Sequence, residues 1–189
     1  MKLLIGLGNM GAQYEGTRHN AGFSVIDVLS ERFRIPVDRA RCKGLIGEGT
    51  VHGERVALIK PQTYMNLSGD CVAAALRWYK VDPKDCMVFS DDIDLALGVI
   101  RVRGFGGAGT HNGWRDILLK TGSDRFPRVR VGVGAKPAQW DLADWVLSRY
   151  QTEDDRKAMQ AAFVRAADAA ECFVQYGIDE AMNIYNRKA

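Results

Sequence analysis

The chain opens with Met1-Lys-Leu-Leu-Ile-Gly-Leu-Gly-Asn-Met-Gly11, an apolar run followed by closely spaced glycines. The segment from Leu3 to Leu7 carries no charge and is too short for a stable helix, so it predicts a strand that is buried on both faces. Strands of this kind belong to sheets that are covered by helices on both sides. The opening stretch therefore favours an α/β fold with a central, largely buried sheet.

The rest of the chain alternates between strand-like and helix-like segments, without repeats or low-complexity tracts. His52-Gly53 predicts the turn of a hairpin. Ser68 predicts a helix cap, and so does Thr152, which stands in capping-box spacing before Asp155. Helices are expected at residues 22–34, 68–79, 112–120 and 152–177 and near Ile184, and strands at 3–7, 44–51, 55–59, 87–90, 99–102 and 129–133. This alternation predicts one α/β domain over residues 1–189.

Composition excludes a disordered chain, because 47% of the 189 residues are apolar. The net charge of +3 is small but unevenly distributed. Residues 1–100 carry twelve basic and twelve acidic side chains, residues 101–136 carry eight and two, and residues 137–189 carry six and nine. The basic block at 101–136 is a candidate footprint for an anion or a nucleic acid.

Cysteine usage and hydropathy indicate an intracellular protein. Cys42, Cys71, Cys86 and Cys172 form no C-x-x-C pair, and each is expected to act as a small buried apolar residue. The N-terminal apolar run is too short for a secretory signal, and no stretch approaches the roughly 20 apolar residues of a transmembrane helix. We therefore expect a soluble, cytoplasmic protein without a membrane partner. Because the chain has no evident exposed apolar stripe, we also expect a monomer.

The glycines at 6, 8 and 11 match the G-x-G-x-x-G pattern of dinucleotide-binding proteins, and Asp27 stands near the expected ribose-binding position. In that pattern the third glycine opens a helix whose N-terminus faces the pyrophosphate. Here Gly11 leads into a polar segment, the helix is expected about ten residues later, and Asp27 falls inside it. The spacing argues against a dinucleotide enzyme, although it leaves that alternative open.

Polar residues gather in four segments near the predicted strand ends. They are residues 9–22 with Asn9 and His19, 60–69 with Asn66, 89–95 with Asp91, Asp92 and Asp94, and the glycine-rich 106–113 with His111 and Asn112. Each has an ordinary alternative: a lone histidine is usually structural, Asn66 is placed to cap a helix, and clustered carboxylates can bind a divalent cation. No partner motif for a metal is present, and repulsion among the carboxylates requires a cation or a charged histidine nearby.

No serine or cysteine stands in a nucleophile-elbow context, because G-x-S-x-G is absent. This argues against a covalent acyl-enzyme. The residues favour a histidine that activates water directly and is oriented by an aspartate, while amide side chains position the substrate and stabilise an oxyanion.

Over about residues 1–135, the four segments resemble the bacterial-type peptidyl-tRNA hydrolase family. The matching motifs are Gly8-Asn9-x-Gly11-x-x-Tyr14-x-x-Thr17-Arg18-His19-Asn20-x-Gly22, Lys60-Pro61-x-Thr63-Tyr64-Met65-Asn66-x-Ser68-Gly69, Asp91-Asp92-x-Asp94-Leu95 and Gly109-x-His111-Asn112-Gly113. The resemblance implies a single α/β domain with a central twisted mixed sheet flanked by helices. It also implies hydrolysis of the ester between a peptide and the 3′ end of tRNA, without metal or cofactor.

The resemblance assigns a role to each matching position. It implies that His19 is the general base, that Asp91 orients it, and that Asn9 helps to hold the reacting carbonyl or water. Asn66 and Asn112 would hydrogen-bond the peptide portion, and His111 would support the substrate-binding cleft. Tyr14 and Met65 would line the cleft beside the terminal nucleotide or the nascent side chains. The acceptor stem and 5′ phosphate of the tRNA would be bound by Arg101, Arg103 and Arg130. Such RNA binding depends mainly on phosphates and A-form shape. The alternative is that the arginines form a solvated strand face.

Three features depart from the family pattern, none at a proposed catalytic position. Met10 stands where proline is usual, Thr110 replaces a glycine, and residues 135–140 differ from the usual Pro-Gly loop. Proteins of the same fold that bind RNA without hydrolysis remain a second class of function. The intact His19 and Asp91 pair favours the enzyme.

Overall fold

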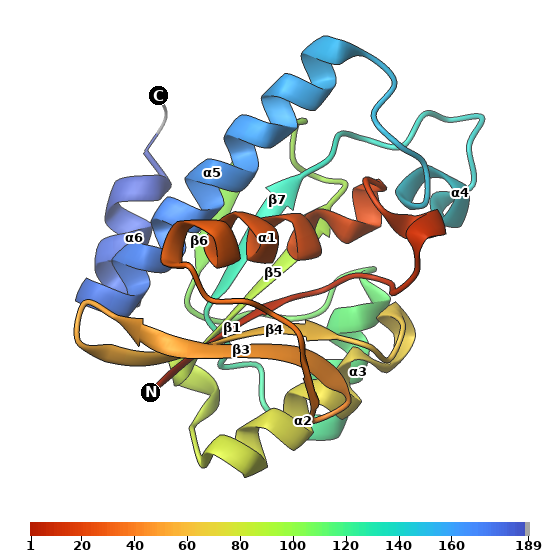
Figure 1. The fold of residues 1–189 in the computed structure, drawn as a ribbon. Coiled ribbons are helices and arrows are strands. Elements are labelled where there is room, and N and C mark those ends of the chain that lie inside the picture. Colours follow the sequence, from red (N-terminus) through yellow and green to blue (C-terminus); the bar gives the residue numbers. More distant parts are fainter. Residues whose placement is uncertain (188–189) are drawn as a thin grey trace.

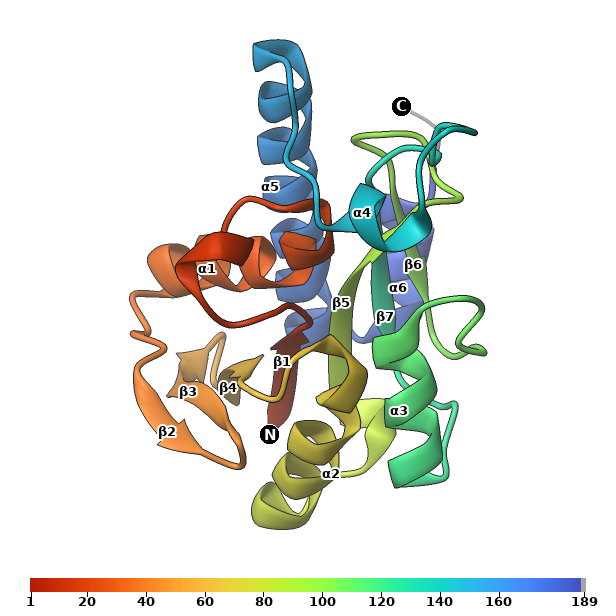
Figure 2. The same cartoon turned by 90° about the vertical axis from the view of Figure 1, so that its right-hand side faces the viewer.

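Seven strands form one mixed sheet in the order β2-β3-β4-β1-β5-β7-β6. Figure 1 labels all of them except β2, which is labelled in Figure 2. The structure is a computed structural model that describes residues 1–187. The apolar run at the N-terminus forms β1, the middle strand, which is parallel to β4 and β5. The strands are β1 (Lys2–Gly6), β2 (Arg39–Arg41), β3 (Gly44–Val51), β4 (Glu54–Pro61), β5 (Cys86–Asp92), β6 (Ile100–Arg103) and β7 (Arg128–Gly132).

Helices cover both faces of this sheet (Figures 1 and 2). The helices are α1 (Ala21–Phe33), α2 (Ser68–Tyr79), α3 (Asn112–Thr121), α4 (Leu142–Val146), α5 (Glu153–Tyr176) and α6 (Ile178–Tyr185). Leu4 of β1 packs in the core beneath α1 and α5, whereas Leu3 and Ile5 pack in the core beneath α2 and α3. Successive side chains of a strand point to opposite faces, so β1 contributes to both cores. The predicted single α/β domain with a mixed sheet is confirmed.

All of the predicted helices and strands are present, with ends displaced by at most two residues. The hairpin turn at His52-Gly53 is confirmed, since Val51 pairs with Glu54 across it. The short edge strand β2, helix α4 and four 3-10 helices were not predicted. Among residues 1–187, no helix combines the length and the apolar character needed to span a membrane.

Two predictions about single residues are wrong. Leu67, not Ser68, is the N-cap of α2, and the Ser68 hydroxyl donates to the Met65 carbonyl at 2.7 Å. Cys42 lies partly exposed in the turn between β2 and β3, while the other three cysteines are buried as expected. The predicted cap at Thr152 is confirmed, because its hydroxyl accepts the Asp155 N–H at 3.0 Å.

Gly6 and Gly22 let α1 lie directly against the sheet. A Cβ atom on Gly6 would lie 2.1 Å from the Gly22 carbonyl oxygen, and one on Gly22 would lie 2.4 Å from the Phe89 carbonyl oxygen. Neither position has room for a side chain. The first glycine of the G-x-G-x-x-G pattern therefore serves helix–sheet packing.

The same region lacks the geometry of a dinucleotide fingerprint. Gly11 is followed by a 3-10 turn, α1 begins only at Ala21, and Asp27 lies within that helix. A fingerprint needs a helix that opens at the third glycine and an acidic residue after the second strand. The observed geometry therefore supports the sequence argument against a dinucleotide enzyme.

We expect Gly6→Ala to lower the free energy of unfolding by about 1–3 kcal/mol, because the added methyl group overpacks the contact between β1 and α1. Urea unfolding followed by circular dichroism measures the difference. Gly107→Ala is the matched control, since a Cβ atom there meets nothing within 4 Å. Equal unfolding midpoints for the two variants would contradict the packing role of Gly6.

Candidate active site

A cleft of about 890 Å³ opens beyond the carboxyl ends of β1, β4 and β5. Because these strands are parallel, the loops that follow them meet at one edge of the sheet, where α/β folds place their sites. Of the predicted site residues, ten line this cleft: Asn9, Tyr14, His19, Met65, Asn66, Asp91, Arg103, His111, Asn112 and Arg130. Arg101 is not among the lining residues.

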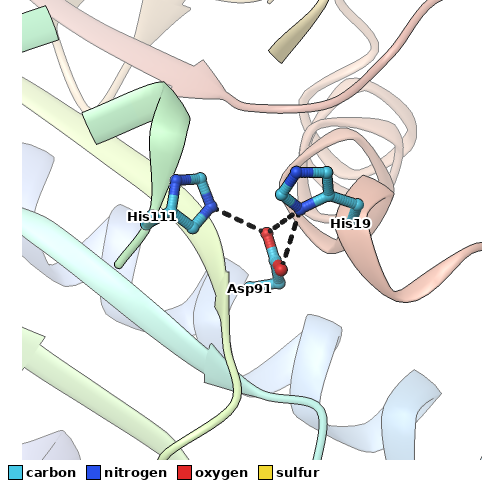
Figure 3. A group of neighbouring side chains, drawn as sticks. All are labelled: His19, Asp91 and His111. Atoms are coloured by element: carbon cyan, nitrogen blue, oxygen red, sulfur yellow. Dashed lines mark hydrogen bonds and ion pairs between the residues drawn. The ribbon is translucent and has the colours of Figure 1, made fainter. Parts of the chain in front are cut away.

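The Asp91 carboxylate lies between two imidazole rings (Figure 3). His19 Nδ1 is 2.9 Å from each carboxylate oxygen, and His111 Nε2 is 2.9 Å from Oδ1. Asp91 belongs to β5 and is 3% exposed, His19 lies in the 3-10 helix η2 (Arg18–Asn20), and His111 is the N-cap of α3. The family resemblance implied a His19–Asp91 pair. The contact between His111 and Asp91 was not predicted.

The hydrogen-bond network assigns a tautomer to each ring. His111 Nδ1 accepts the Trp114 N–H at 3.4 Å, so its proton lies on Nε2 and points at Asp91. His19 donates from Nδ1 to the same carboxylate, which leaves its Nε2 on the side away from Asp91 (Figure 3). A neutral His19 therefore carries its lone pair on Nε2, where it can accept a proton.

Electrostatics couples His19 to Asp91. Burial by itself lowers the pKa of His19, but the negative charge and hydrogen bond of Asp91 outweigh it, and the net pKa is raised. Burial raises the pKa of Asp91, yet the two neighbouring imidazoles hold it well below its usual range. Asp91 therefore stays ionised and stabilises a positive charge on His19.

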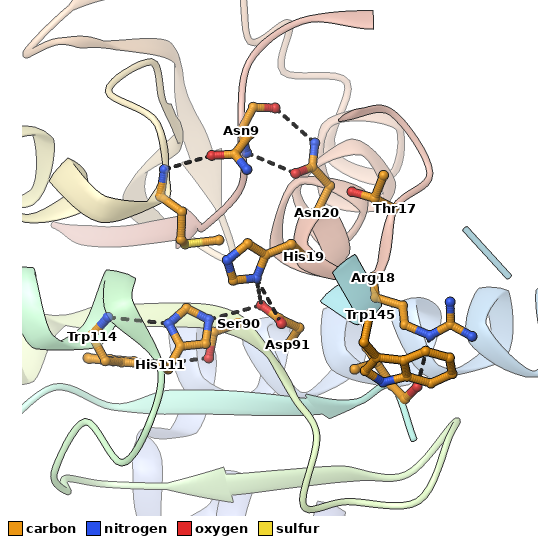
Figure 4. Close-up of polar contacts among 12 residues, drawn as sticks. Asn9, Thr17, Arg18, His19, Asn20, Ser90, Asp91, His111, Trp114 and Trp145 are labelled. Carbon is orange, nitrogen blue, oxygen red and sulfur yellow. Dashed lines mark hydrogen bonds and ion pairs between the residues drawn. The ribbon is translucent and has the colours of Figure 1, made fainter. Parts of the chain in front are cut away.

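Asn9 is held in one orientation beside this pair (Figure 4). Its backbone N–H donates to Asn20 Oδ1 at 2.8 Å, and Asn20 Nδ2 donates back to the Asn9 carbonyl at 2.9 Å. The Met65 N–H donates to Asn9 Oδ1 at 2.7 Å. Since Oδ1 is occupied, Asn9 offers its Nδ2 hydrogens to the cleft, as a donor for a carbonyl or oxyanion.

Arg18 ties the turn that carries His19 to the wall formed by α4 (Figure 4). Its guanidinium lies 3.7 Å from the centre of the Trp145 ring and donates to Ser148 Oγ at 2.6 Å and the Arg149 carbonyl at 2.8 Å. Arg18 is 3% exposed, and residues of α4 line the cleft. The motif match included Arg18, but its stacking on Trp145 was not predicted.

Four arginines form two cross-strand pairs at the edge of the sheet. Arg101 faces Arg130, and Arg103 faces Arg128, in the antiparallel register of β6 and β7. Directly opposed residues share one face of a sheet. Valines of the two strands fill the opposite, buried face. The register thus gathers part of the predicted basic block beside the cleft.

These arginines differ in what they contact. Arg101 donates to the Asn186 carbonyl at 3.3 Å, and Arg130 Nε pairs with Asp92 at 2.6 Å. Arg128, which was not predicted as a site residue, is buried and donates to backbone carbonyls of the glycine-rich loop. Arg103 is exposed, and its side chain has no hydrogen bond or ion pair within residues 1–187. It is therefore free to bind an anion at the rim of the cleft.

His19, Asp91 and His111 also form a group with metal-ligand chemistry, since their donor atoms lie within 4.8 Å of one another. The nitrogen–oxygen distances of 2.9 Å are those of direct hydrogen bonds. The group therefore satisfies its buried charge without an ion, through the two imidazoles.

Comparison with known proteins gives the family. A family model described as peptidyl-tRNA hydrolase matches residues 3–189. The chain belongs to the peptidyl-tRNA hydrolase family. It is 49% identical to a peptidyl-tRNA hydrolase of Lachnospira eligens and 48% identical to one of Chloroflexus aggregans, with 98% of this chain and 100% and 99% of those chains covered.

A solved structure agrees with this assignment. The crystal structure of peptidyl-tRNA hydrolase from Acinetobacter baumannii matches with a TM-score of 0.91 at 34% identity, over 97% of this chain and 93% of that one. The family resemblance of the four motifs is thereby confirmed, and the match extends through the C-terminal helices.

We expect Asp91→Asn to lower the pKa of His19 from above its usual value of about 6.5 to below it, because only the effect of burial remains. NMR titration of the His19 ring measures the change. Asp94→Asn is the control, since Asp94 belongs to the same acidic cluster but is exposed. A His19 titration unaffected by Asp91→Asn would contradict the coupling.

Proposed function

We propose that this chain hydrolyses the ester bond between the peptide and the tRNA in peptidyl-tRNA, and so releases peptide and free tRNA. The observation that carries the proposal is the His19 imidazole held by the buried Asp91 carboxylate in an open cleft. The substrate class comes from the family to which the chain belongs. Relatives named peptidyl-tRNA hydrolase match this chain over nearly their full length.

The reaction begins when His19 Nε2 takes a proton from a water molecule whose oxygen attacks the ester carbonyl carbon. Negative charge then develops on the carbonyl oxygen, and Asn9 Nδ2 donates a hydrogen bond to it. Asp91 remains a carboxylate and stabilises the imidazolium. As the ester C–O bond breaks, His19 returns its proton to the leaving 3′ oxygen of the tRNA.

Amide and aromatic side chains around the pair hold the peptide portion of the substrate. Asn66 and Asn112 are exposed and line the cleft. Asn66 does not cap α2, whose N-cap is Leu67, so its amide is available to a ligand. Tyr14 and Met65 contribute apolar lining, and His111 supports the site through Asp91.

The arginines of β6 and β7 hold the tRNA through its phosphates. Arg103 and Arg130 line the cleft, and Arg101 lies directly across from Arg130 in the sheet. We assign the acceptor stem and 5′ phosphate to this edge, with Arg103 as the main contact because it has no competing partner among residues 1–187. We expect the enzyme to act as a monomer in the cytoplasm, where translation supplies its substrate.

Peptide release from N-acetylated aminoacyl-tRNA tests the proposal. We expect His19→Ala to lower kcat/KM by roughly 10²- to 10⁴-fold, the usual contribution of a general base. In the unmodified protein kcat/KM rises with pH through the raised pKa of His19 and then levels off, since the base works deprotonated. His52→Ala, which alters an exposed histidine in a hairpin turn, is the control. No release by the unmodified protein would favour RNA binding without catalysis, and full activity of His19→Ala would contradict the mechanism.

We expect Arg103→Gln to raise KM with little change in kcat, because the variant binds the tRNA phosphates less tightly. The slope of log KM against log salt should fall by roughly 0.7–0.9 for each phosphate that the variant no longer neutralises. Arg101→Gln should have a smaller effect, because the Arg101 guanidinium is bound to Asn186. KM values measured from low to moderate salt compare the two variants. Equal KM values for Arg103→Gln and the unmodified protein would contradict the assignment of Arg103 to the tRNA.

A further inference from the structure

We infer that the ring of Phe105 is a stacking platform for a nucleobase of the single-stranded 3′ end of the tRNA. Phe105 lies in the loop between β6 and α3, which projects beside α3 in Figure 2. Its side chain is 68% exposed, and it lines the same cleft as His19 and Asp91. The inference rests on the proposed function for its substrate, and it assigns to Phe105 a part in binding.

The backbone that carries Phe105 is held firmly although the ring is exposed. The Gly106 N–H donates to the Asp124 carbonyl at 3.1 Å. Arg128 donates to the carbonyls of Gly106 and Gly107 at 2.7 and 2.9 Å. These bonds begin at the residue directly after Phe105. The ring is therefore presented from a fixed loop, which lowers the entropy cost of binding to it.

Arg128 can hold the loop because it is itself fixed. Its guanidinium lies 3.6 Å from the centre of the Trp114 ring, and Arg128 is 3% exposed. Trp114 donates from Nε1 to Ser90 Oγ at 2.9 Å, and Ser90 precedes Asp91 in β5. One chain of contacts thus connects the loop of Phe105 to the strand that carries the buried carboxylate.

The charges around Phe105 favour a nucleotide over a peptide side chain. Arg103 stands two residues earlier and is exposed, and Arg130 also lines the cleft. An aromatic ring next to cationic side chains fits a ligand that has both a flat base and a phosphate. In the proposed substrate, unpaired nucleotides join the ester to the acceptor stem. Phe105 lines the same cleft as Arg103, assigned to the stem, and His111, which contacts Asp91, so its ring is within the space that these unpaired nucleotides would occupy.

Steady-state kinetics with N-acetylated aminoacyl-tRNA gives the first test. We expect Phe105→Ala to raise KM by about 5- to 100-fold, the range typical of removing one base–aromatic stack by alanine substitution, with kcat nearly unchanged. Phe105→Trp retains a stacking ring and should keep KM close to the original value. Tyr176→Ala removes a similarly exposed aromatic at the end of α5 and is the control for surface effects.

Binding of the trinucleotide C-C-A, with 2-aminopurine in place of adenine, separates the nucleobase from the peptide. The probe contains no ester, so it reports on stacking even if the chain released no peptide and the proposed function failed. We expect the unmodified protein and Phe105→Trp to bind and quench the probe, and Phe105→Ala to bind it more weakly by about the factor seen in KM. Equal probe binding by Phe105→Ala and the unmodified protein would overturn the inference. A raised KM together with equal probe binding would assign the ring to the peptide instead.

Discussion

The carboxylate of Asp91 is buried at the end of β5 and accepts hydrogen bonds from two imidazole rings. A charge at this depth is costly unless it is paired, and the rings of His19 and His111 provide the pairing. His19 comes from the turn that leads into α1, on one face of the sheet, and His111 from the start of α3, on the other. The need to satisfy this single charge fixes both rings, their tautomers and the side of His19 that remains reactive.

The carboxylates of Asp91, Asp92 and Asp94 have different surroundings, which explains how the three can lie so close in sequence. Asp92 pairs with Arg130, and Asp94 is exposed. Repulsion among them is offset by two histidines and one arginine, with no ion required. Since Asp91 contacts the proposed base and Asp92 contacts a proposed tRNA-binding arginine, neighbouring residues of one strand connect the reacting centre to the basic edge of the sheet.

Much of this arrangement could be predicted from the sequence, because it depends on local pattern. The apolar run at residues 3–7 identified the central strand, and polar segments after parallel strands must meet at one edge. Apart from the His19–Asp91 pair, which the family resemblance implied, contacts between distant segments could not be predicted. The His111–Asp91 bond and the stacking of Arg18 on Trp145 depend on tertiary packing, and the different environment of Arg101 depends on Asn186, beyond the end of α6.

The charge count alone does not say which arginines of the basic block at residues 101–136 can bind a ligand. Burial, reinforced by the nearby charge of Arg130, lowers the pKa of Arg128 to about 10. Arg128 donates to carbonyls of the glycine-rich loop. Its guanidinium therefore stabilises the wall of the cleft and does not bind a ligand. Arg103, which faces Arg128 from the neighbouring strand β6, has an exposed side chain. The buried Arg128 therefore holds the glycine-rich loop rigid, and we infer that this rigidity lets Phe105 meet a ligand in a fixed geometry near the exposed Arg103.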